Sequence, residues 1–225
     1  MKAHPFKILV ILMTFAMTAT AQYTEEAENI QYVSWGLVAG PNMSGCRMAL
    51  DSTDGAPDQT HPCLGFDAGG FLEYHITPRW SLQFQALGAL ERTATSKDGL
   101  DNLIATLGIN ISAAVCHRYE KAEGTWLVTM GPYTHFMMWN DIYGEGNLEN
   151  PFTRIISSDP RTGEPRFAMT DFCAGLEIAI GYEFASHWQI RGFLMWGITD
   201  LLNVDSHDLY VKPYKAGCLV AYHFL

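Results

Sequence analysis

The chain has 225 residues, of which 48% are hydrophobic, and a formal net charge of −10 at pH 7. This length is enough for one domain with a large apolar surface. The acidic balance disfavours nucleic acid as a partner, because phosphate binding requires a basic surface. Composition alone leaves open a soluble acidic β-sandwich and a membrane β-barrel.

The chain starts with the pattern of an exported protein. Lys2 and Lys7 precede an apolar run over residues 8–16, and the small residues Ala19-Thr20-Ala21 follow it. This pattern predicts a cleaved secretory signal peptide over residues 1–21. No uninterrupted apolar run of about 18 residues follows it, so any membrane crossing by the remaining chain must use strands.

Eight segments of alternating polar and apolar residues follow, each near the length of about ten residues that a tilted membrane strand requires. Trp188, Ile190 and Leu194 face one way in such a segment, while Gln189 and Arg191 face the other. In a soluble sandwich the apolar face would be the core, whereas in a membrane barrel it faces lipid. The eight segments lie near residues 33–43, 64–76, 80–92, 103–117, 126–139, 170–184, 188–199 and 214–225.

The last segment ends on an outward-facing pair of aromatic residues, Tyr222 and Phe224. The last strand of an up-and-down barrel must pair with the first strand to remove both sheet edges. We therefore expect this segment to be the C-terminal barrel-closing strand, and to be the part that engages a barrel-assembly machinery.

The connections between the eight segments alternate in length. The even-numbered connections are short, at 77–79, 118–125 and 185–187, and the odd-numbered ones are longer and polar, at 44–63, 93–102, 140–169 and 200–213. Short periplasmic turns and longer external loops are typical of outer-membrane barrels, and a sandwich has no reason to keep every second loop short. The predicted fold is an all-β, eight-stranded antiparallel transmembrane up-and-down β-barrel over residues 33–225, after a short periplasmic segment 22–32.

Several ordered stretches resemble one known family. They are Gly36–Asn42, Gly65–Tyr74 with Arg79–Gln83, Met130–Tyr133, Gly181–Phe184 and Ala221–Phe224. Together they resemble the PorT-like outer-membrane β-barrel proteins of Gram-negative bacteria. The resemblance implies an integral outer-membrane barrel that is an accessory to protein secretion across the envelope.

An eight-stranded barrel is just wide enough for side chains to fill its interior. Inward-facing candidates are Asp67, Glu73, His75, Gln83, Gln85, Asn110, Glu177, Glu183 and Arg191. Buried carboxylates need partners, so we expect Arg191 to be the counter-ion of Glu177 or Glu73. These residues and Gln85 form a predicted structural network that fills the lumen and leaves no open pore.

The five cysteines are an odd number for an oxidising compartment. Cys46 and Cys63 bracket a polar loop, and the spacing is compatible both with a disulfide at its base and with free thiols throughout. Cys116, Cys173 and Cys218 lie in apolar alternating stretches and are interpreted as small buried or lipid-facing residues.

Motifs for chemistry are weak in this chain. The histidines are scattered singly, with no His-Glu-x-x-His or paired Cys-x-x-Cys spacing, so no metal and no cofactor is predicted. The acidic group of Asp200, Asp205 and Asp208 is interpreted as a solvated loop rather than a Ca²⁺ site. His135, Asp141 and Ser157 or Ser158 can meet near the third external loop, but ordinary rim residues explain them better.

The prediction is a non-enzymatic outer-membrane barrel with a structural or interaction role in protein secretion or envelope assembly. Its expected partners are outer-membrane lipid, the barrel-assembly machinery and a protein at the external loop 140–169. Two alternatives remain, namely a barrel enzyme with a rim site acting on lipid or peptide, and a soluble periplasmic lipid-binding β-barrel.

Overall fold

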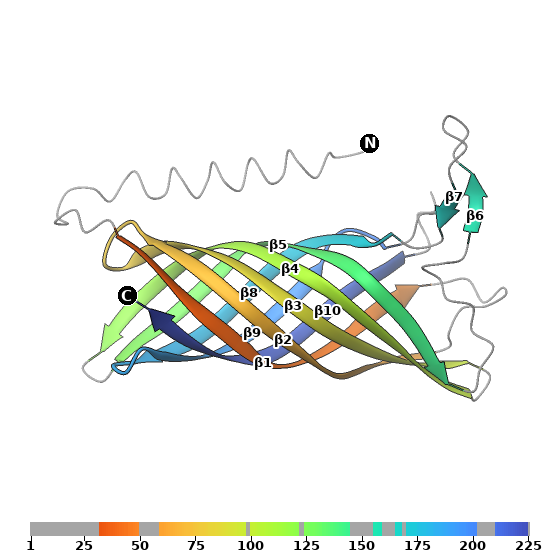
Figure 1. Ribbon diagram of the computed structural model, residues 1–225, viewed down its shortest axis with the longest axis horizontal. Coiled ribbons are helices and arrows are strands. Elements are labelled where there is room, and N and C mark those ends of the chain that lie inside the picture. The colour runs from red at the N-terminus through yellow and green to blue at the C-terminus, as the bar shows by residue number, and fades with distance from the viewer. Residues whose placement is uncertain are drawn as a thin grey trace.

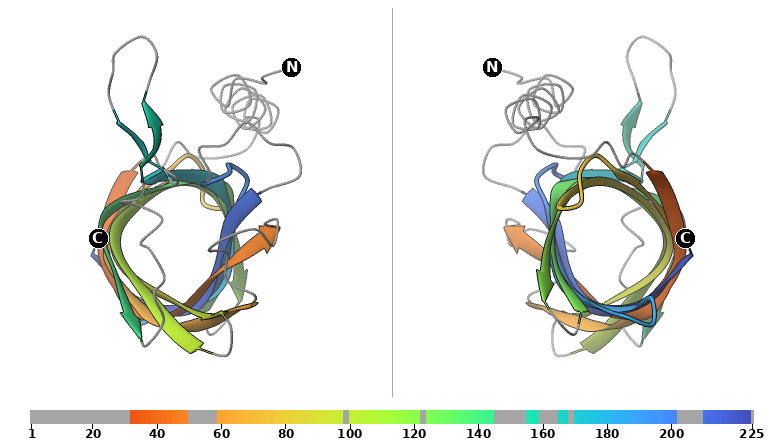
Figure 2. Two further views of the ribbon diagram at one scale, coloured as in Figure 1. Left: turned by 90° about the vertical axis from the view of Figure 1, so that its right-hand side faces the viewer. Right: turned by 90° about the vertical axis from the view of Figure 1, so that its left-hand side faces the viewer.

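Eight antiparallel strands form one closed barrel in the computed structural model (Figures 1 and 2). They are β1 (Tyr32–Ala49), β2 (Gln59–His75), β3 (Trp80–Lys97), β4 (Leu100–Lys121), β5 (Gly124–Gly144), β8 (Phe172–Phe184), β9 (Trp188–Gly197) and β10 (Tyr210–Phe224). Two short strands between β5 and β8, β6 (Ile155–Ser158) and β7 (Pro165–Phe167), pair as a separate sheet. The predicted eight-stranded up-and-down barrel is confirmed.

The structure describes residues 32–49, 59–97, 100–121, 124–144, 155–158, 165–167, 170–201 and 210–224. The predicted signal peptide, all but the last residue of the segment 22–32, and parts of the loop 140–169 lie outside these residues. Within them, no helix has the length and apolar character that crossing a membrane demands.

The barrel closes where β10 pairs with β1, and Figure 2 shows the two strands side by side in the wall. Phe224 is the register partner of Trp35, and Tyr222 is the partner of Leu37. The rings of Trp35 and Phe224 stack with their centroids 4.3 Å apart. Hydrogen bonds and aromatic packing thus join the two ends of the barrel domain, with the strand that carries Tyr222 and Phe224 as the closing strand.

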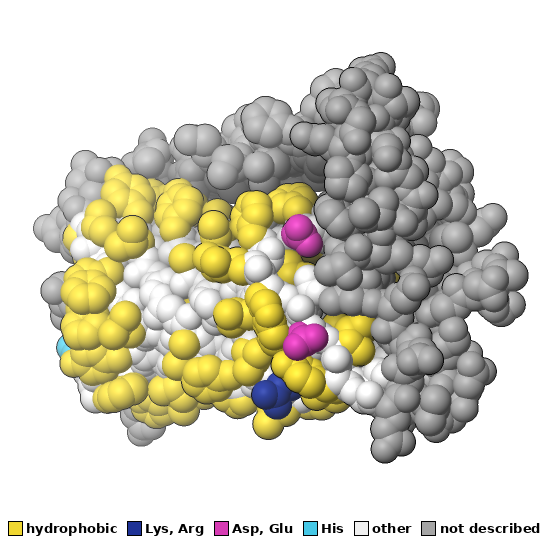
Figure 3. All heavy atoms as spheres, turned by 45° about the vertical axis from the view of Figure 1, so that its right-hand side comes forward, with side chains coloured by type: hydrophobic (Ala, Val, Ile, Leu, Met, Phe, Trp, Pro, Cys, Tyr) yellow, Lys and Arg dark blue, Asp and Glu magenta, His cyan; other side chains and the backbone are white. Residues whose placement is uncertain are grey.

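Alternation along each strand places apolar side chains outside and polar side chains inside. In β9 every second residue is exposed, from Trp188 to Trp196, and the residues between them are buried, Gln189 and Arg191 included. Figure 3 shows the result on one face of the barrel, where hydrophobic side chains cover much of the surface. A soluble monomer rarely exposes a contiguous apolar surface of this extent, so the outer face is built for an apolar surrounding.

Six of the eight barrel strands are longer than predicted, mainly at the end of the barrel that carries the longer connections, whereas β8 and β9 are each two residues shorter than predicted at that end. We call this end the loop end, and its connections are 50–58, 98–99, 145–171 and 198–209. We call the other end the turn end, and its connections are 76–79, 122–123 and 185–187. The predicted loop 93–102 is wrong, because β3 and β4 stay paired up to Lys97 and Leu100. Backbone pairing does not require apolar side chains, so polar sequence does not end a ladder.

A layer of buried apolar side chains crosses the middle of the lumen. It consists of Val38, Phe71, Leu87, Tyr133, Ala179, Phe193, Met195, Leu219 and Ala221. Glycines on the adjacent paired strands make room for the larger rings. A Cβ at Gly36 would lie 2.4 Å from the Phe71 ring, and one at Gly217 would lie 2.5 Å from Phe193. The middle of the lumen is therefore packed with side chains, and besides the apolar layer it holds the Arg191 guanidinium against the Phe71 ring.

Candidate functional site

Ion-paired side chains form two clusters inside the lumen, one toward each end of the barrel, and a third polar group, Arg191 with Gln83 and Gln85, lies against Phe71 of the apolar layer. The turn-end cluster consists of Ser34, Glu73, His75, Ser81, Arg118, Glu183, Gln189 and His223. The loop-end cluster consists of Asp67, Glu91, Asn110, His135 and Lys215. Each cluster contains two carboxylates and one basic side chain, which is Arg118 at the turn end and Lys215 at the loop end.

Lys215 is the centre of the loop-end cluster. Its Nζ atom lies 3.0 Å from Asp67 Oδ1 and 3.0 Å from Glu91 Oε1. The side chains of Lys215 and Asp67 are almost completely buried, with exposed fractions of 5% and 0%. One ammonium group therefore holds two buried carboxylates, and its removal would leave both without a counter-ion.

His135 projects into the same cluster from β5. Its Nδ1 atom lies 2.7 Å from Asn110 Oδ1 and 3.8 Å from Glu91 Oε1. An amide oxygen only accepts hydrogen bonds, so Nδ1 carries the proton toward Asn110. The other ring nitrogen, Nε2, is buried without a hydrogen-bond partner, and this leaves a lone pair available inside the lumen.

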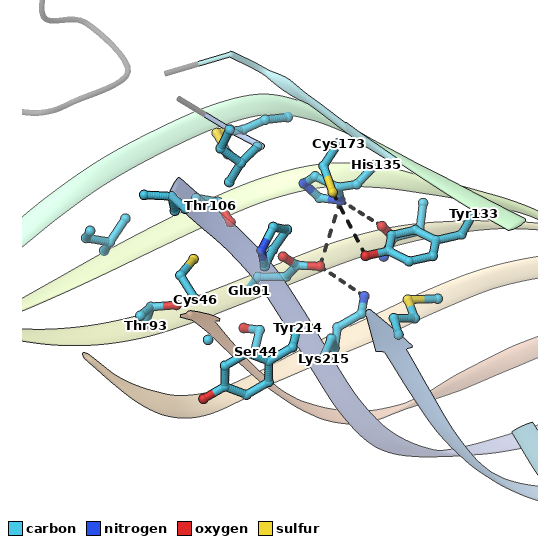
Figure 4. A pocket seen from close by; sticks show the side chains of 18 of the residues that line it. Ser44, Cys46, Glu91, Thr93, Thr106, Tyr133, His135, Cys173, Tyr214 and Lys215 are labelled. Carbon is cyan, nitrogen blue, oxygen red and sulfur yellow. Dashed lines mark hydrogen bonds and ion pairs between the residues drawn. The ribbon is translucent and has the colours of Figure 1, made fainter. Parts of the chain in front are cut away.

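A cavity of about 70 Å³ adjoins this cluster (Figure 4). Glu91, His135 and Lys215 line it, with Tyr133 and Cys173 close to His135 and Cys46 nearer Thr93. Apolar side chains complete the lining, among them Ile104, Met137, Met195, Leu201 and Val211. The cavity has room for a few water-sized groups, so the loop end of the lumen is less completely filled than the middle.

Arg118 is the centre of the turn-end cluster. Its guanidinium donates to both carboxylate oxygens of Glu73, at 2.9 Å each from Nη2, and Nη1 donates to Glu183 Oε2 at 2.8 Å. Ser81 also donates a hydrogen bond to Glu73 Oε1. This is a bidentate, charge-assisted arrangement of the strong kind, and it ties β2, β4 and β8 together inside the barrel.

Two histidines meet in the turn-end cluster next to Glu73. Ser34 Oγ lies 3.0 Å from His75 Nε2 and 2.6 Å from His223 Nε2. The same nitrogen atoms lie 4.0 Å and 3.8 Å from the Glu73 carboxylate. The prediction that the histidines are scattered singly is wrong for His75 and His223, because β1, β2 and β10 are neighbours in the closed barrel.

Arg191 has partners other than the predicted ones. Its Nη1 and Nη2 atoms donate to Gln83 Oε1 at 2.8 Å and to Gln85 Oε1 at 3.3 Å. Glu73, a predicted partner, pairs with Arg118 instead. Glu177 is buried in the same part of the lumen, but no ion pair within 4.0 Å joins it to Arg191 in the described residues. Arg191 thus makes no direct pair with Glu73, which Arg118 on β4 binds instead, while Glu177 and Glu73 attract Arg191 electrostatically from farther away, Glu177 more strongly.

The cysteines are free thiols throughout the described residues. Cys46 lines the cavity, whereas Cys63 Sγ contacts the carbonyl oxygen of His61 at 3.8 Å. The bridge between Cys46 and Cys63 stays a prediction.

The residues proposed for a rim enzyme are not joined where the structure describes them. His135 bonds to Asn110, while Asp141 Oδ1 accepts a hydrogen bond from the backbone of Ile142. Ser157 and Ser158 lie in β6, in the separate sheet. Of the acidic group considered for Ca²⁺, Asp200 Oδ1 accepts from the backbone of Val211, and Asp205 and Asp208 lie outside the described residues.

Several residues of both clusters were missed from the sequence. They are Ser34, Glu91, Arg118, Lys215 and His223. Each lies near the end of a predicted strand or beyond it, where the alternation was not followed. Continuing the inward parity from Leu219 along β10 would have reached Lys215 and His223, and continuing it from Asn110 along β4 would have reached Arg118.

No family model matches the chain, and no curated protein matches it. Among solved structures, the chain is similar to the attachment invasion locus protein Ail of Yersinia pestis, with 12% identity and a TM-score of 0.41 over 85% of this chain and 99% of that one. It is also similar to Neisserial surface protein A, with 12% identity and a TM-score of 0.44 over 86% of this chain and 99% of that one. The outer membrane protein OprG from Pseudomonas aeruginosa gives 10% identity and a TM-score of 0.44 over 85% and 94%.

At these identities the likeness concerns the fold alone. The resemblance of the sequence to the PorT-like family stays a prediction, since no family model supports it.

Proposed function

We propose that the protein is a sealed, non-enzymatic barrel of the outer membrane with a structural or interaction role at the cell envelope. The observation that carries this proposal is the pairing of an apolar outer face with a lumen filled by side chains. The turn end lies in the periplasm and the loop end lies outside. The predicted signal peptide over residues 1–21 supplies the export route.

The outer face has the layout of a membrane-spanning surface. Its aliphatic band includes Leu72, Ile109, Ile111, Val128, Met130, Ile178, Ile180, Ile190 and Leu194, all exposed. Aromatic side chains flank this band, with Trp35, Trp126 and Trp188 near the turn end and Trp139 and Trp196 nearer the loop end. Aromatic residues at two levels are typical of the two membrane–water interfaces, and this supports outer-membrane lipid as the surrounding.

The lumen supports a role other than diffusion. The apolar layer with Phe71, Phe193 and Leu219 crosses the barrel, and the Arg191 guanidinium lies 5.2 Å from the centre of the Phe71 ring. Eight strands leave an interior that side chains can fill, whereas porins use about 16–18. We therefore propose no solute channel. The protein acts instead through the surfaces that the barrel presents to its partners.

Three partners follow from the proposal. Outer-membrane lipid contacts the apolar band, and the barrel-assembly machinery receives the closing strand through Tyr222 and Phe224. A protein partner binds at the external loop 140–169, since function on a rigid scaffold is commonly carried by loops. The PorT-like resemblance narrows the interaction role to an accessory of protein secretion or envelope assembly.

Heat modifiability and conductance test the proposal together. Protein extracted from outer membranes by detergent should migrate faster on a gel before boiling than after it, because a closed barrel resists detergent unfolding. The same protein in a planar bilayer should give no stable conductance steps. Release from cells by salt washing with no gel shift would contradict the membrane assignment and favour the soluble lipid-binding barrel.

A further inference from the structure

We propose that the turn-end cluster is a binding site for one divalent transition-metal ion, with Zn²⁺ as the best-fitting probe. The ligands would be His75, His223 and Glu73, with the hydroxyl of Ser34 beside them. One potential ligand atom from each of the first three residues lies within 4.8 Å of the other two, and all three residues are buried. The site lies at the seam where the last strand closes the barrel on the first.

The donor set has the chemistry of a zinc site. Two imidazole nitrogens and a carboxylate oxygen are standard Zn²⁺ ligands, at about 2.0–2.2 Å from the ion, and a fourth position can remain for a hydroxyl or water. His223 Nε2 lies 3.8 Å from Glu73 Oε2 and His75 Nε2 lies 4.0 Å from Glu73 Oε1, and both separations are slightly wide for two ligand atoms of one Zn²⁺ ion. Small rotations of the two imidazole rings would close them.

A second carboxylate orients one of the imidazoles toward the ion. His223 Nδ1 lies 3.4 Å from Glu183 Oε1, and Gln189 Nε2 donates to the other oxygen of Glu183 at 2.9 Å. With the Nδ1 proton directed to the carboxylate, the Nε2 atom of His223 presents its lone pair to the site. Such a carboxylate–histidine pair accompanies most histidine ligands of metal ions and raises their basicity.

Glu73 keeps capacity for an ion despite its ion pair with Arg118. Its Oε1 atom receives hydrogen bonds from Ser81 and Arg118, but its Oε2 atom receives only the one from Arg118 Nη2. Oε2 is also the oxygen nearest His223, at 3.8 Å from Nε2. The cluster holds two carboxylates against one guanidinium, so neutral histidines leave a net negative charge that a divalent cation would offset.

An ion at this site would link strands that lie far apart in the sequence. Ser34 lies on β1, His75 on β2 and His223 on β10, and the β1–β10 ladder is the one that closes the barrel. An ion bound there connects the first hairpin to the last strand. Because the three strands adjoin only in the closed barrel, the ion binds the folded state and stabilises it by mass action.

Metal analysis of the whole protein tests the proposal. Folded protein in detergent is stripped with a chelator, desalted, incubated with Zn²⁺ and desalted again before elemental analysis. We expect a single retained Zn²⁺ per chain, and a higher temperature for loss of the fast-migrating gel band with Zn²⁺ than after chelation. Protein that retains no Zn²⁺ would show that the cluster is a hydrogen-bonded plug only and would overturn the proposal, while leaving the barrel assignment untouched.

Matched variants locate the site. His75→Gln and His223→Gln should lose the retained Zn²⁺ and its thermal effect, and Glu183→Gln should weaken Zn²⁺ affinity about 10–100-fold through its effect on His223. The control is His117→Gln, since His117 lies at the same end of the barrel but on the outer face against Trp80, with ring centroids 4.4 Å apart. Wild-type Zn²⁺ retention in both histidine variants would overturn the proposal.

A spectroscopic test covers variants that fail to fold. Co²⁺ added to the stripped wild-type protein should give visible ligand-field bands of a low-symmetry nitrogen and oxygen site, and Zn²⁺ should remove them. Absence of these bands in folded wild-type protein would count against the site.

Discussion

The two ends of the lumen carry similar charges but pair them differently. At the turn end, the Arg118 guanidinium bonds to Glu73 through two nitrogens and to Glu183 through a third. At the loop end, the single Nζ atom of Lys215 reaches both Asp67 and Glu91. The planar guanidinium of arginine donates hydrogen bonds in fixed directions and so fixes the positions of its partners. The ammonium of lysine is a compact charge at the end of a flexible side chain.

The two clusters also differ in the space beside them. The turn-end cluster has the branched guanidinium of Arg118 and the stacked imidazole rings of His75 and His223, whose centroids lie 6.2 Å apart. The loop-end cluster borders the cavity of about 70 Å³ and leaves His135 Nε2 without a partner. The loop end therefore has room for water or a small group beside its charged residues.

The largest loss of unfolding free energy is expected from breaking the ion pair between Arg118 and Glu73 at the turn end. Arg118→Gln leaves the carboxylate of Glu73, of which 1% is exposed, without a counter-ion. Removal of one partner of a buried ion pair costs about 3–5 kcal/mol. Urea unfolding of the barrel in detergent should show this loss of stability.

Arg79→Gln is the control for Arg118→Gln. The Arg79 side chain is exposed in the turn after β2, so its replacement should change the unfolding free energy by less than about 0.5 kcal/mol. Equal effects of the two replacements would contradict the pairing that distinguishes the turn end.

A smaller loss is expected for the corresponding change at the loop end. Lys215→Gln removes the cation from Asp67 and Glu91, but the adjoining cavity can admit water to them. We expect a cost of about 1–3 kcal/mol, measured in the same urea titration, with the exposed Lys121→Gln as the neutral control. A larger loss of unfolding free energy than for Arg118→Gln would mean that water in the cavity does not solvate Asp67 and Glu91.

The packed layer should resist added volume. Ala221→Val places two methyl groups in a site with 1% exposure among Val38, Phe71 and their neighbours. Overpacking of this kind costs about 1–3 kcal/mol, which a lower urea midpoint at unchanged slope would show. An unchanged midpoint would indicate spare volume in the middle of the lumen.

The smallest change in unfolding free energy is expected at the cavity itself, and it should be a gain in stability. Val211 is fully buried and lines the cavity, so Val211→Ile adds one methylene where space exists. Filling a cavity commonly stabilises a protein by about 0.5–2 kcal/mol, and one methylene should give the lower end of that range. Destabilisation by Val211→Ile would remove the distinction between the loop end and the packed layer.

Much of the fold could be predicted from local pattern. The faces of β3, β8 and β9 follow directly from the alternation, as with Gln83 and Gln85 inside and Phe84 outside. Strand ends were predicted less well, because a hydrogen-bonded ladder continues through polar sequence, as β3 and β4 do up to Lys97 and Leu100. Arg118 was consequently assigned to a turn although it lies inside the lumen.

The partners within the lumen could not be predicted in the same way. Arg191 was expected to bind Glu73 or Glu177, and it binds Gln83 and Gln85 across the barrel. His75 and His223 are far apart in the sequence and adjoin only because β10 closes on β1. Position along a strand gives the face of a side chain, whereas its neighbours across the lumen depend on the stagger of all eight strands.

The sequence by itself determined the number of barrel strands, their faces and the closing role of the strand with Tyr222 and Phe224, since a two-residue period and aromatic placement are local properties of the chain. Only the tertiary structure decided which cation meets which carboxylate, where the lumen keeps a cavity, and that His75, His223 and Glu73 share one site. The physical reason is that these contacts join residues from different strands, and their distances are set by the register and closure of the whole sheet.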